Sequence, residues 1–143
     1  MPNTMIKHEI TADWKGGMSF ENAIDGFTNI VDAATEFGGN NLGPSPKKLI
    51  LAGLAGCTGM DIVSLLTKMR EPLSSLSLKI EAYMTEEHPK VYSDIVIIYR
   101  FKASDNLDKA KVEKAVKMSQ DTYCGVAAML RKGSNVRFEI VYE

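Results

Sequence analysis

The hydrophobic pattern of the first third of the chain alternates with the short period of β-strands. Apolar residues alternate with other residues over Met5–Trp14, and shorter apolar runs follow at Met18–Ala23 and Phe27–Val31. Period-two alternation is typical of a strand with one covered face. Gly-Gly at 16–17 and Asp-Gly at 25–26 separate these runs, and both dipeptides favour tight hairpin turns. This part of the chain therefore predicts three consecutive strands joined by short turns.

A loop rich in glycine and asparagine, Thr35–Ser45, leads into the clearest helix of the chain. Ser45 is suited to cap this helix and Pro46 to occupy its first position, where a missing N–H group costs nothing. We predict that the helix runs to about Arg70, since Pro72 disfavours helical backbone before it. Its many glycines and alanines would let another backbone approach closely, so we predict a central and tightly packed helix.

The rest of the chain predicts two strands, two helices and a final strand. In order, the expected elements are the strand Leu76–Met84, the strand Ile95–Phe101, a helix over about Asp108–Tyr123, a short helix from near Cys124 to Gly133, and the strand Val136–Tyr142. No internal repeat or linker interrupts this order. The sequence βββ-α-ββ-αα-β predicts one α+β domain covering residues 1–143.

Composition narrows the class of protein. The 143 residues carry a formal net charge of −1, which argues against a nucleic-acid partner or attraction to an anionic membrane. The N-terminus has neither the basic nor the apolar region of a signal peptide. Polar residues interrupt the apolar stretch 49–66, so we expect a buried globular helix and not a membrane span. Only two cysteines occur, which favours a reducing cytoplasm over a secreted disulfide scaffold.

The two cysteines are the candidate chemistry. Cys57 lies in an apolar helix, where a cysteine is commonly a small buried hydrophobic residue. Cys124 should lie in the first turn of a short helix, where exposed N–H groups and the helix dipole favour thiolate. Both positions are compatible with redox chemistry, but the residues alone do not decide between a structural and a redox role for these cysteines.

Two segments resemble the OsmC/Ohr family of osmotically inducible and organic hydroperoxide resistance proteins, and most closely a divergent OsmC-like subgroup. The segment 45–57, from Ser-Pro-Lys-Lys to Ala-Gly-Cys, looks like the helix that carries the peroxidatic cysteine of that family. The segment 123–130, Tyr-Cys-Gly-Val-Ala-Ala-Met-Leu, resembles its second-cysteine segment. The order of predicted elements also matches over essentially the whole chain.

The resemblance implies an OsmC-like fold, an intertwined homodimer with a long central cysteine-bearing helix, and active sites at the dimer interface. Cys57 would attack an organic hydroperoxide and become a sulfenic acid. Cys124 would then form a disulfide with it, which an external dithiol reduces. The implied activity is that of an antioxidant oxidoreductase, a thiol peroxidase of the oxidative-stress response that needs no metal or organic cofactor.

The chain departs from the family pattern at the groups that activate the thiol. The family has a glutamate after the helix-starting proline and an arginine from an early strand, but here Lys47 follows Pro46 and no arginine precedes Arg70. Lys15 is the nearest cationic substitute, and Glu36 in the loop is a candidate to orient it. The departures favour an alternative, in which the protein binds a small molecule or lipid, or senses redox state, with weak or no peroxidase activity.

The remaining polar residues give weaker evidence for a functional site. Asp61 falls one turn after Cys57 on the same helical face, either as a partner of the thiol or as a structural polar residue at the dimer interface. An anion there counts against an activated thiol. His8 and His88 have no further ligand at metal spacing, so we expect no metal site.

Overall fold

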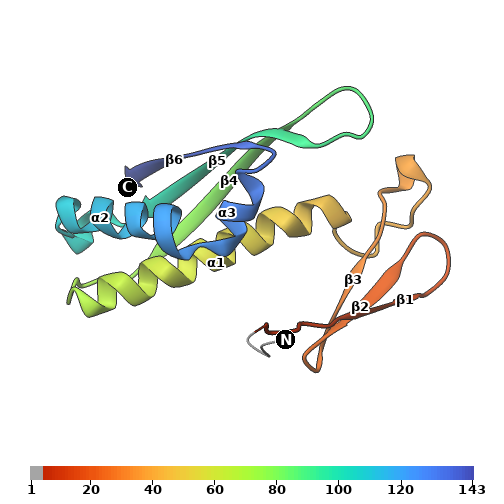
Figure 1. The fold of residues 1–143 in the computed structure, drawn as a ribbon, viewed down its shortest axis with the longest axis horizontal. Coiled ribbons are helices and arrows are strands. Elements are labelled where there is room, and N and C mark those ends of the chain that lie inside the picture. The colour runs from red at the N-terminus through yellow and green to blue at the C-terminus, as the bar shows by residue number, and fades with distance from the viewer. Residues whose placement is uncertain (1–4) are drawn as a thin grey trace. The chain divides into compact units, whose positions relative to one another are not determined.

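A computed structural model describes residues 5–143 and divides them into two compact units (Figure 1). The first contains the described residues up to Ile50, and the second is Leu51–Glu143. Helix α1 (Pro46–Lys68) begins at the end of the first unit and continues in the second. The chain has the mixed α+β class and the order of strands and helices expected from its sequence. The prediction of a single domain stays a prediction.

The first unit is built on a three-stranded antiparallel sheet in the order β1-β2-β3. Its strands are β1 (Thr11–Trp14), β2 (Phe20–Ile24) and β3 (Phe27–Val31). The predicted turn at 25–26 is confirmed, because both of its residues have positive φ, 51° and 85°, as a two-residue hairpin turn requires. The predicted first strand was too long at its start, since β2 ends soon after the partner of Thr11 and leaves residues 5–10 nothing to pair with.

A buried carboxylate organises the loop after β3. Asp32 is 2% exposed and accepts hydrogen bonds from the backbone N–H groups of Ala33, Asn40 and Leu42, at 2.7, 3.2 and 3.2 Å. Gly39 is required here, since a Cβ atom would lie 1.9 Å from the carbonyl oxygen of Ala33. The loop therefore has one defined path despite its glycines and asparagines.

The second unit packs helices against a second three-stranded sheet (Figure 1). Besides α1, its elements are β4 (Leu76–Met84), β5 (Tyr92–Phe101), α2 (Lys109–Met118), a π-helical turn (Ser119–Tyr123), α3 (Gly125–Leu130) and β6 (Asn135–Tyr142). The central strand β5 pairs antiparallel with β4 and parallel with β6. A parallel neighbour needs a crossover connection, and here α2, the turn and α3 supply it.

The core of the second unit lies between this sheet and the helices. Fully buried side chains come from α1, β5 and α2, namely Leu54, Ile62, Leu66, Ile95, Ile97, Tyr99, Phe101, Val112, Ala115 and Val116. Burial alternates along β4 and β6, as expected for strands with one covered face. Cys57 packs against the edge of this core, and Cys124 is part of it.

Helix α1 is apolar enough to pass as a membrane span, but one of its faces is buried in the core of the second unit. By length and composition α1 passes as a membrane span, with a mean hydropathy of 1.9. Core helices of globular proteins pass the same test, and Leu54, Ile62 and Leu66 of α1 are fully buried in the core of the second unit. Over residues 5–143, Cβ atoms at Gly53 or Gly56 would meet nothing within 4 Å, so the expected close approach of another backbone stays a prediction.

Three helix ends differ from prediction. Helix α1 ends at Lys68, and Arg70 turns the chain with a φ of 60°. The second predicted helix changes at Ser119 into a π-helical turn, because Cys124 N–H closes onto the Ser119 carbonyl five residues back. The third ends at Leu130, so Gly133 is not the residue that stops it.

Candidate active site

The structure brings the two cysteines together. Cys57 lies at the middle of α1, and Cys124 is the N-cap residue of α3. Both are free, and their thiols are hydrogen-bonded to each other. Cys57 is partly exposed, whereas Cys124 is 2% exposed. A dissolved reagent can therefore reach Cys57 more easily, with Cys124 buried behind it.

Cys124 is a protonated thiol at neutral pH. Burial is the main cause that raises its pKa, and the neighbouring Cys57 thiol and Asp61 carboxylate also raise it. The N–H of Ala127 donates to the sulfur at 3.4 Å and lowers the pKa, as expected at a helix start. Burial outweighs this bond, and the pKa rises to about 11. The helix start therefore lowers the pKa of Cys124 as predicted, but burial, which the sequence did not predict, keeps this thiol protonated.

A chain of buried hydroxyl groups connects the two cysteine-bearing segments. Thr58, the residue after Cys57, lies 2.6 Å from the Tyr99 hydroxyl and 2.7 Å from Ser119 Oγ. Ser119 Oγ in turn lies 2.8 Å from Asp61 Oδ2. An ionised carboxylate only accepts hydrogen bonds, so Ser119 donates to Asp61, Thr58 donates to Ser119, and Tyr99 donates to Thr58. The Asp61 carboxylate thus sets the direction of every bond in the chain.

Gln120 and Arg131 close this network on its other side. The Gln120 side-chain amide donates to the Tyr99 hydroxyl at 2.8 Å. Arg131 donates to the Gln120 backbone carbonyl at 2.6 Å and to its side-chain oxygen at 2.5 Å. Burial raises the pKa of Tyr99 although the bonds from Thr58 and Gln120 lower it, so the phenol stays neutral and able to donate.

The sequence predicts little of this network. Asp61 stands out one helical turn after Cys57, but Thr58, Tyr99, Ser119 and Gln120 carry no comparable signal, although each is buried. The available signal was weak: a threonine next to a candidate cysteine, and a Ser-Gln pair interrupting an apolar helical stripe. Pairing polar residues from α1, β5 and the π-helical turn needs the tertiary fold.

The two candidate helpers of Cys57 belong to the first unit. Lys15 lies in the connection between β1 and β2, where its N–H donates to the Ser19 carbonyl at 3.0 Å. Glu36 is exposed in the 3-10 turn Thr35–Phe37. Their roles toward Cys57 stay predictions.

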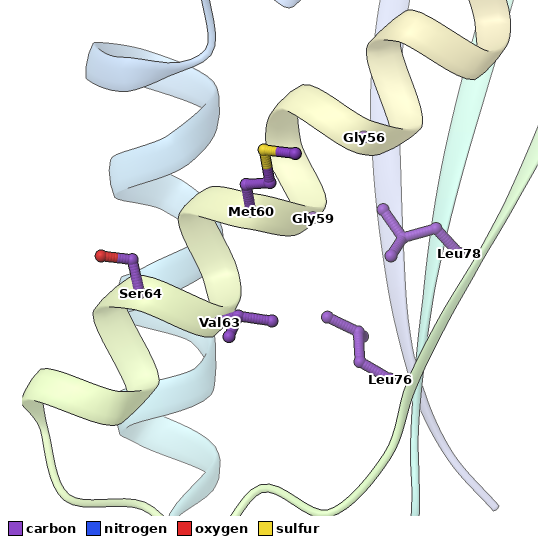
Figure 2. A pocket seen from close by; sticks show the side chains of 7 residues that line it. All are labelled: Gly56, Gly59, Met60, Val63, Ser64, Leu76 and Leu78. Carbon is purple, nitrogen blue, oxygen red and sulfur yellow. The ribbon is translucent and has the colours of Figure 1, made fainter. Parts of the chain in front are cut away.

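An apolar groove runs along α1 beside the cysteine (Figure 2). Its volume is about 510 Å³, and its walls come from α1 and β4: Gly56, Gly59, Met60, Val63, Ser64, Leu76 and Leu78. Neither cysteine lines it, although Gly56 directly precedes Cys57. Over residues 5–143, no group of three His, Cys, Asp or Glu side chains is arranged to hold a metal ion.

These features define an α+β protein with a paired, unequally buried dithiol. The profile of the OsmC-like protein family matches residues 38–139. Protein YhfA of Escherichia coli strain K12 is 34% identical over 100 residues, which cover 68% of this chain and 74% of that protein. The chain belongs to the OsmC-like family.

Solved structures share the fold over nearly the whole chain. A hypothetical protein from Aquifex aeolicus has a TM-score of 0.81 at 24% identity, covering 97% of this chain and 99% of its own. The organic hydroperoxide resistance protein OhrB of Bacillus subtilis has a TM-score of 0.65 at 18% identity, covering 94% and 98%. The expected OsmC-like fold is confirmed.

Proposed function

We propose that the protein is a thiol-dependent peroxidase that reduces organic hydroperoxides with Cys57 and Cys124. The observation that carries this proposal is the hydrogen bond between the two thiols, which lie far apart in the sequence and differ in exposure. Membership of the OsmC-like family and the likeness to a protein named for organic hydroperoxide resistance support it.

The reaction has two steps on the protein. The Cys57 thiolate attacks the outer oxygen of the hydroperoxide, the O–O bond breaks, and the alkoxide leaves as an alcohol after taking up a proton. Cys57 becomes a sulfenic acid. Cys124 then attacks the Cys57 sulfur, a disulfide forms, and the hydroxyl leaves as water with the thiol proton of Cys124. The short distance between the thiols favours this closure over further oxidation of Cys57.

An external dithiol completes the cycle. It reduces the disulfide to two thiols and is itself oxidised to a disulfide, so no metal or organic cofactor takes part. A reducing cytoplasm would supply such a dithiol, and two unbridged cysteines suit that location. From the sequence, Lys15 is the candidate to supply the positive charge that the Cys57 thiolate needs, and Glu36 is the candidate to orient a lysine.

We further propose that the protein works as a homodimer. Apolar side chains of the first sheet are exposed, including Trp14 at 66% and Phe27 at 77%. The exposed glycine face of α1 could also accept a second backbone. Sedimentation equilibrium tests this: Phe27→Lys should shift the protein toward monomer, and Val91→Lys, at a 48% exposed loop position, should not. A monomeric wild-type protein at micromolar concentration would contradict the dimer.

Rapid-mixing thiol oxidation tests the peroxidase. The reduced wild-type protein, Cys57→Ser and Cys124→Ser are mixed with cumene hydroperoxide or hydrogen peroxide. We expect fast loss of two thiols in the wild type, no fast reaction in Cys57→Ser, and a trapped sulfenic acid in Cys124→Ser. Cumene hydroperoxide should react faster than hydrogen peroxide. A wild-type rate no better than that of an unperturbed free thiol would exclude the peroxidase.

The groove along α1 favours a second candidate function, binding of a small apolar molecule. Its walls are almost entirely hydrocarbon, as in many ligand sites. Binding of an apolar fluorescent dye to Val63→Gln and Val91→Gln gives a matched comparison, because the two valines are 47% and 48% exposed but only Val63 lines the groove. Weaker binding in Val63→Gln alone would support this function, and equal binding in both would contradict it.

A further inference from the structure

The segment that presents Cys124 is tied to the helix that carries Cys57 at one point. The Ser119 carbonyl accepts the Cys124 N–H at 2.7 Å, closing the π-helical turn. The Ser119 side chain is fully buried and donates to Asp61 at 2.8 Å. Asp61 lies one helical turn after Cys57 on α1. Asp61 and Ser119 therefore connect the helix that carries Cys57 to the backbone of Cys124.

We propose that Asp61 is a positioning residue for Cys124, acting through Ser119 and the π-helical turn to hold this thiol against Cys57. This rests on the proposed function, since a positioned second thiol has a use only if Cys57 is oxidised. π-Helical turns are rare and frequently occur at functional sites. Here the turn carries Ser119 and Gln120 into the buried network, and it ends at Cys124.

Asp61 has a second effect, of opposite sign, through its charge. The carboxylate helps to raise the pKa of Cys124, after burial and the Cys57 thiol. Among the described residues, the titratable groups that act on Cys124 are Cys57 and Asp61 from α1, and Cys124 in turn acts on Tyr99 from β5. Arg131, after α3, acts on Tyr99 and bonds to Gln120. A protonated Cys124 does not compete with Cys57 for the peroxide. The same protonation slows attack on the oxidised Cys57, because the thiolate is the nucleophile.

The two effects can be separated with two substitutions. Asp61→Asn removes the charge but keeps an amide oxygen that can accept the Ser119 hydrogen bond. Ser119→Ala keeps the charge but removes the tether. If Asp61 acts as proposed, the first change speeds disulfide closure and the second slows it. A residue that merely stabilised the fold would slow closure in both variants.

The experiment measures closure with diamide, so it does not depend on peroxidase activity. The Cys57 thiolate adds to the N=N bond of diamide, and Cys124 then attacks the Cys57 sulfur, forming the disulfide and releasing the reduced hydrazine. At high diamide concentration, the kinetic phase whose rate no longer depends on diamide reports disulfide closure. Its rate is measured from pH 7 to 9.5 in wild type, both variants and the control Asp121→Asn, an exposed residue of the same turn.

We expect wild-type closure to quicken with rising pH across this range, because Cys124 is mostly protonated. Asp61→Asn should lower the pKa of Cys124 and so increase its thiolate fraction. Each tenfold increase in that fraction should speed disulfide closure about threefold, because a thiolate of lower pKa is also a weaker nucleophile. Ser119→Ala should close about tenfold more slowly. Asp121→Asn should match wild type.

Closure of Ser119→Ala at the wild-type rate would overturn the proposal. If Ser119→Ala did not fold, equal closure rates in Asp61→Asn and Asp61→Ala would overturn it, because both variants lack the charge and only the alanine lacks the acceptor for Ser119. Failure of the peroxidase is a separate result: inertness to cumene hydroperoxide together with the expected diamide rates would reject the proposed function and leave the positioning role of Asp61 in place.

Discussion

The two compact units differ in how they use their apolar residues. In the first, three strands leave Trp14, Phe20 and Phe27 between 41% and 77% exposed, and among strand residues only Val31 is buried. In the second, the sheet is covered by helices, and no residue of its central strand β5 is exposed: half are buried and half are partly buried. The second unit has a core of its own, whereas the described strands of the first unit leave most of their apolar side chains exposed.

The difference bears on where chemistry can be held in place. A sheet needs a second layer against its apolar face to be stable alone, which is why we propose that a second copy covers the first unit. The second unit already holds both cysteines and a buried polar network in a packed core. Polar groups in such a core keep one geometry, because an unsatisfied buried partner is costly.

The largest expected effect comes from truncating the core of the second unit. Leu54 is fully buried and Leu42, in the first unit, is 62% exposed. Leu54→Ala should lower the free energy of unfolding by about 2–5 kcal/mol through lost burial and a cavity, and Leu42→Ala by no more than about 0.5 kcal/mol. Urea unfolding followed by circular dichroism measures both. Equal losses would remove the contrast between the units.

A smaller loss of stability should follow from removing one hydroxyl group of the buried network. Thr58→Val removes the hydroxyl that bonds Tyr99 and Ser119, leaving buried polar groups without a partner. We expect the free energy of unfolding to fall by about 1–3 kcal/mol. Thr67→Val, on the exposed end of the same helix, should change little, since within residues 5–143 its hydroxyl bonds only the Val63 carbonyl. If the two variants unfold at the same urea concentration, the network does not stabilise the second unit.

Acid should weaken the first unit through Asp32. Burial alone would raise the pKa of this carboxyl, but the N–H groups of Leu42, Ala33 and Asn40 outweigh it and hold the pKa below its usual value. A carboxyl with a lowered folded pKa stabilises the fold above its unfolded pKa of about 4, and this stabilisation is lost as the pH falls.

The Asp32 prediction is checked by thermal unfolding from pH 6 to pH 2.5. The wild-type Tm should fall more steeply with acid than that of Asp32→Asn, whose amide does not titrate in this range. Parallel Tm curves for the two proteins would mean that the Asp32 charge does not hold the loop.

The smallest expected effect is at the surface of the second sheet. Arg100 donates two hydrogen bonds to Glu143, at 3.1 and 3.0 Å, but both side chains are about half exposed. Exposed ion pairs contribute little and are screened by salt. Glu143→Gln should therefore change the Tm by less than roughly 3 °C, and less still in 0.5 M salt. A larger, salt-independent change would show that the chain terminus anchors the sheet.

Most of the element order was predictable from hydrophobic periodicity and turn residues. Strands β3 and β4 were predicted with their observed bounds, and the long helix with its first residue, because Pro46 and the Asp-Gly turn act locally. The ends that were wrong depend on partners: β1 is short because β2 ends, and α2 gives way to a π-helical turn where Ser119 meets Asp61 and Thr58.

The sequence by itself determined the elements, the two candidate thiols and the family resemblance, since these follow from residue types and their spacing. Only the tertiary structure decided that Cys57 and Cys124 meet, and that Cys124 is buried enough to stay protonated. Burial and hydrogen bonding between distant segments depend on how α1, β5 and α3 pack. No local pattern encodes that packing, so the environment of each thiol could not be read from its neighbours in the chain.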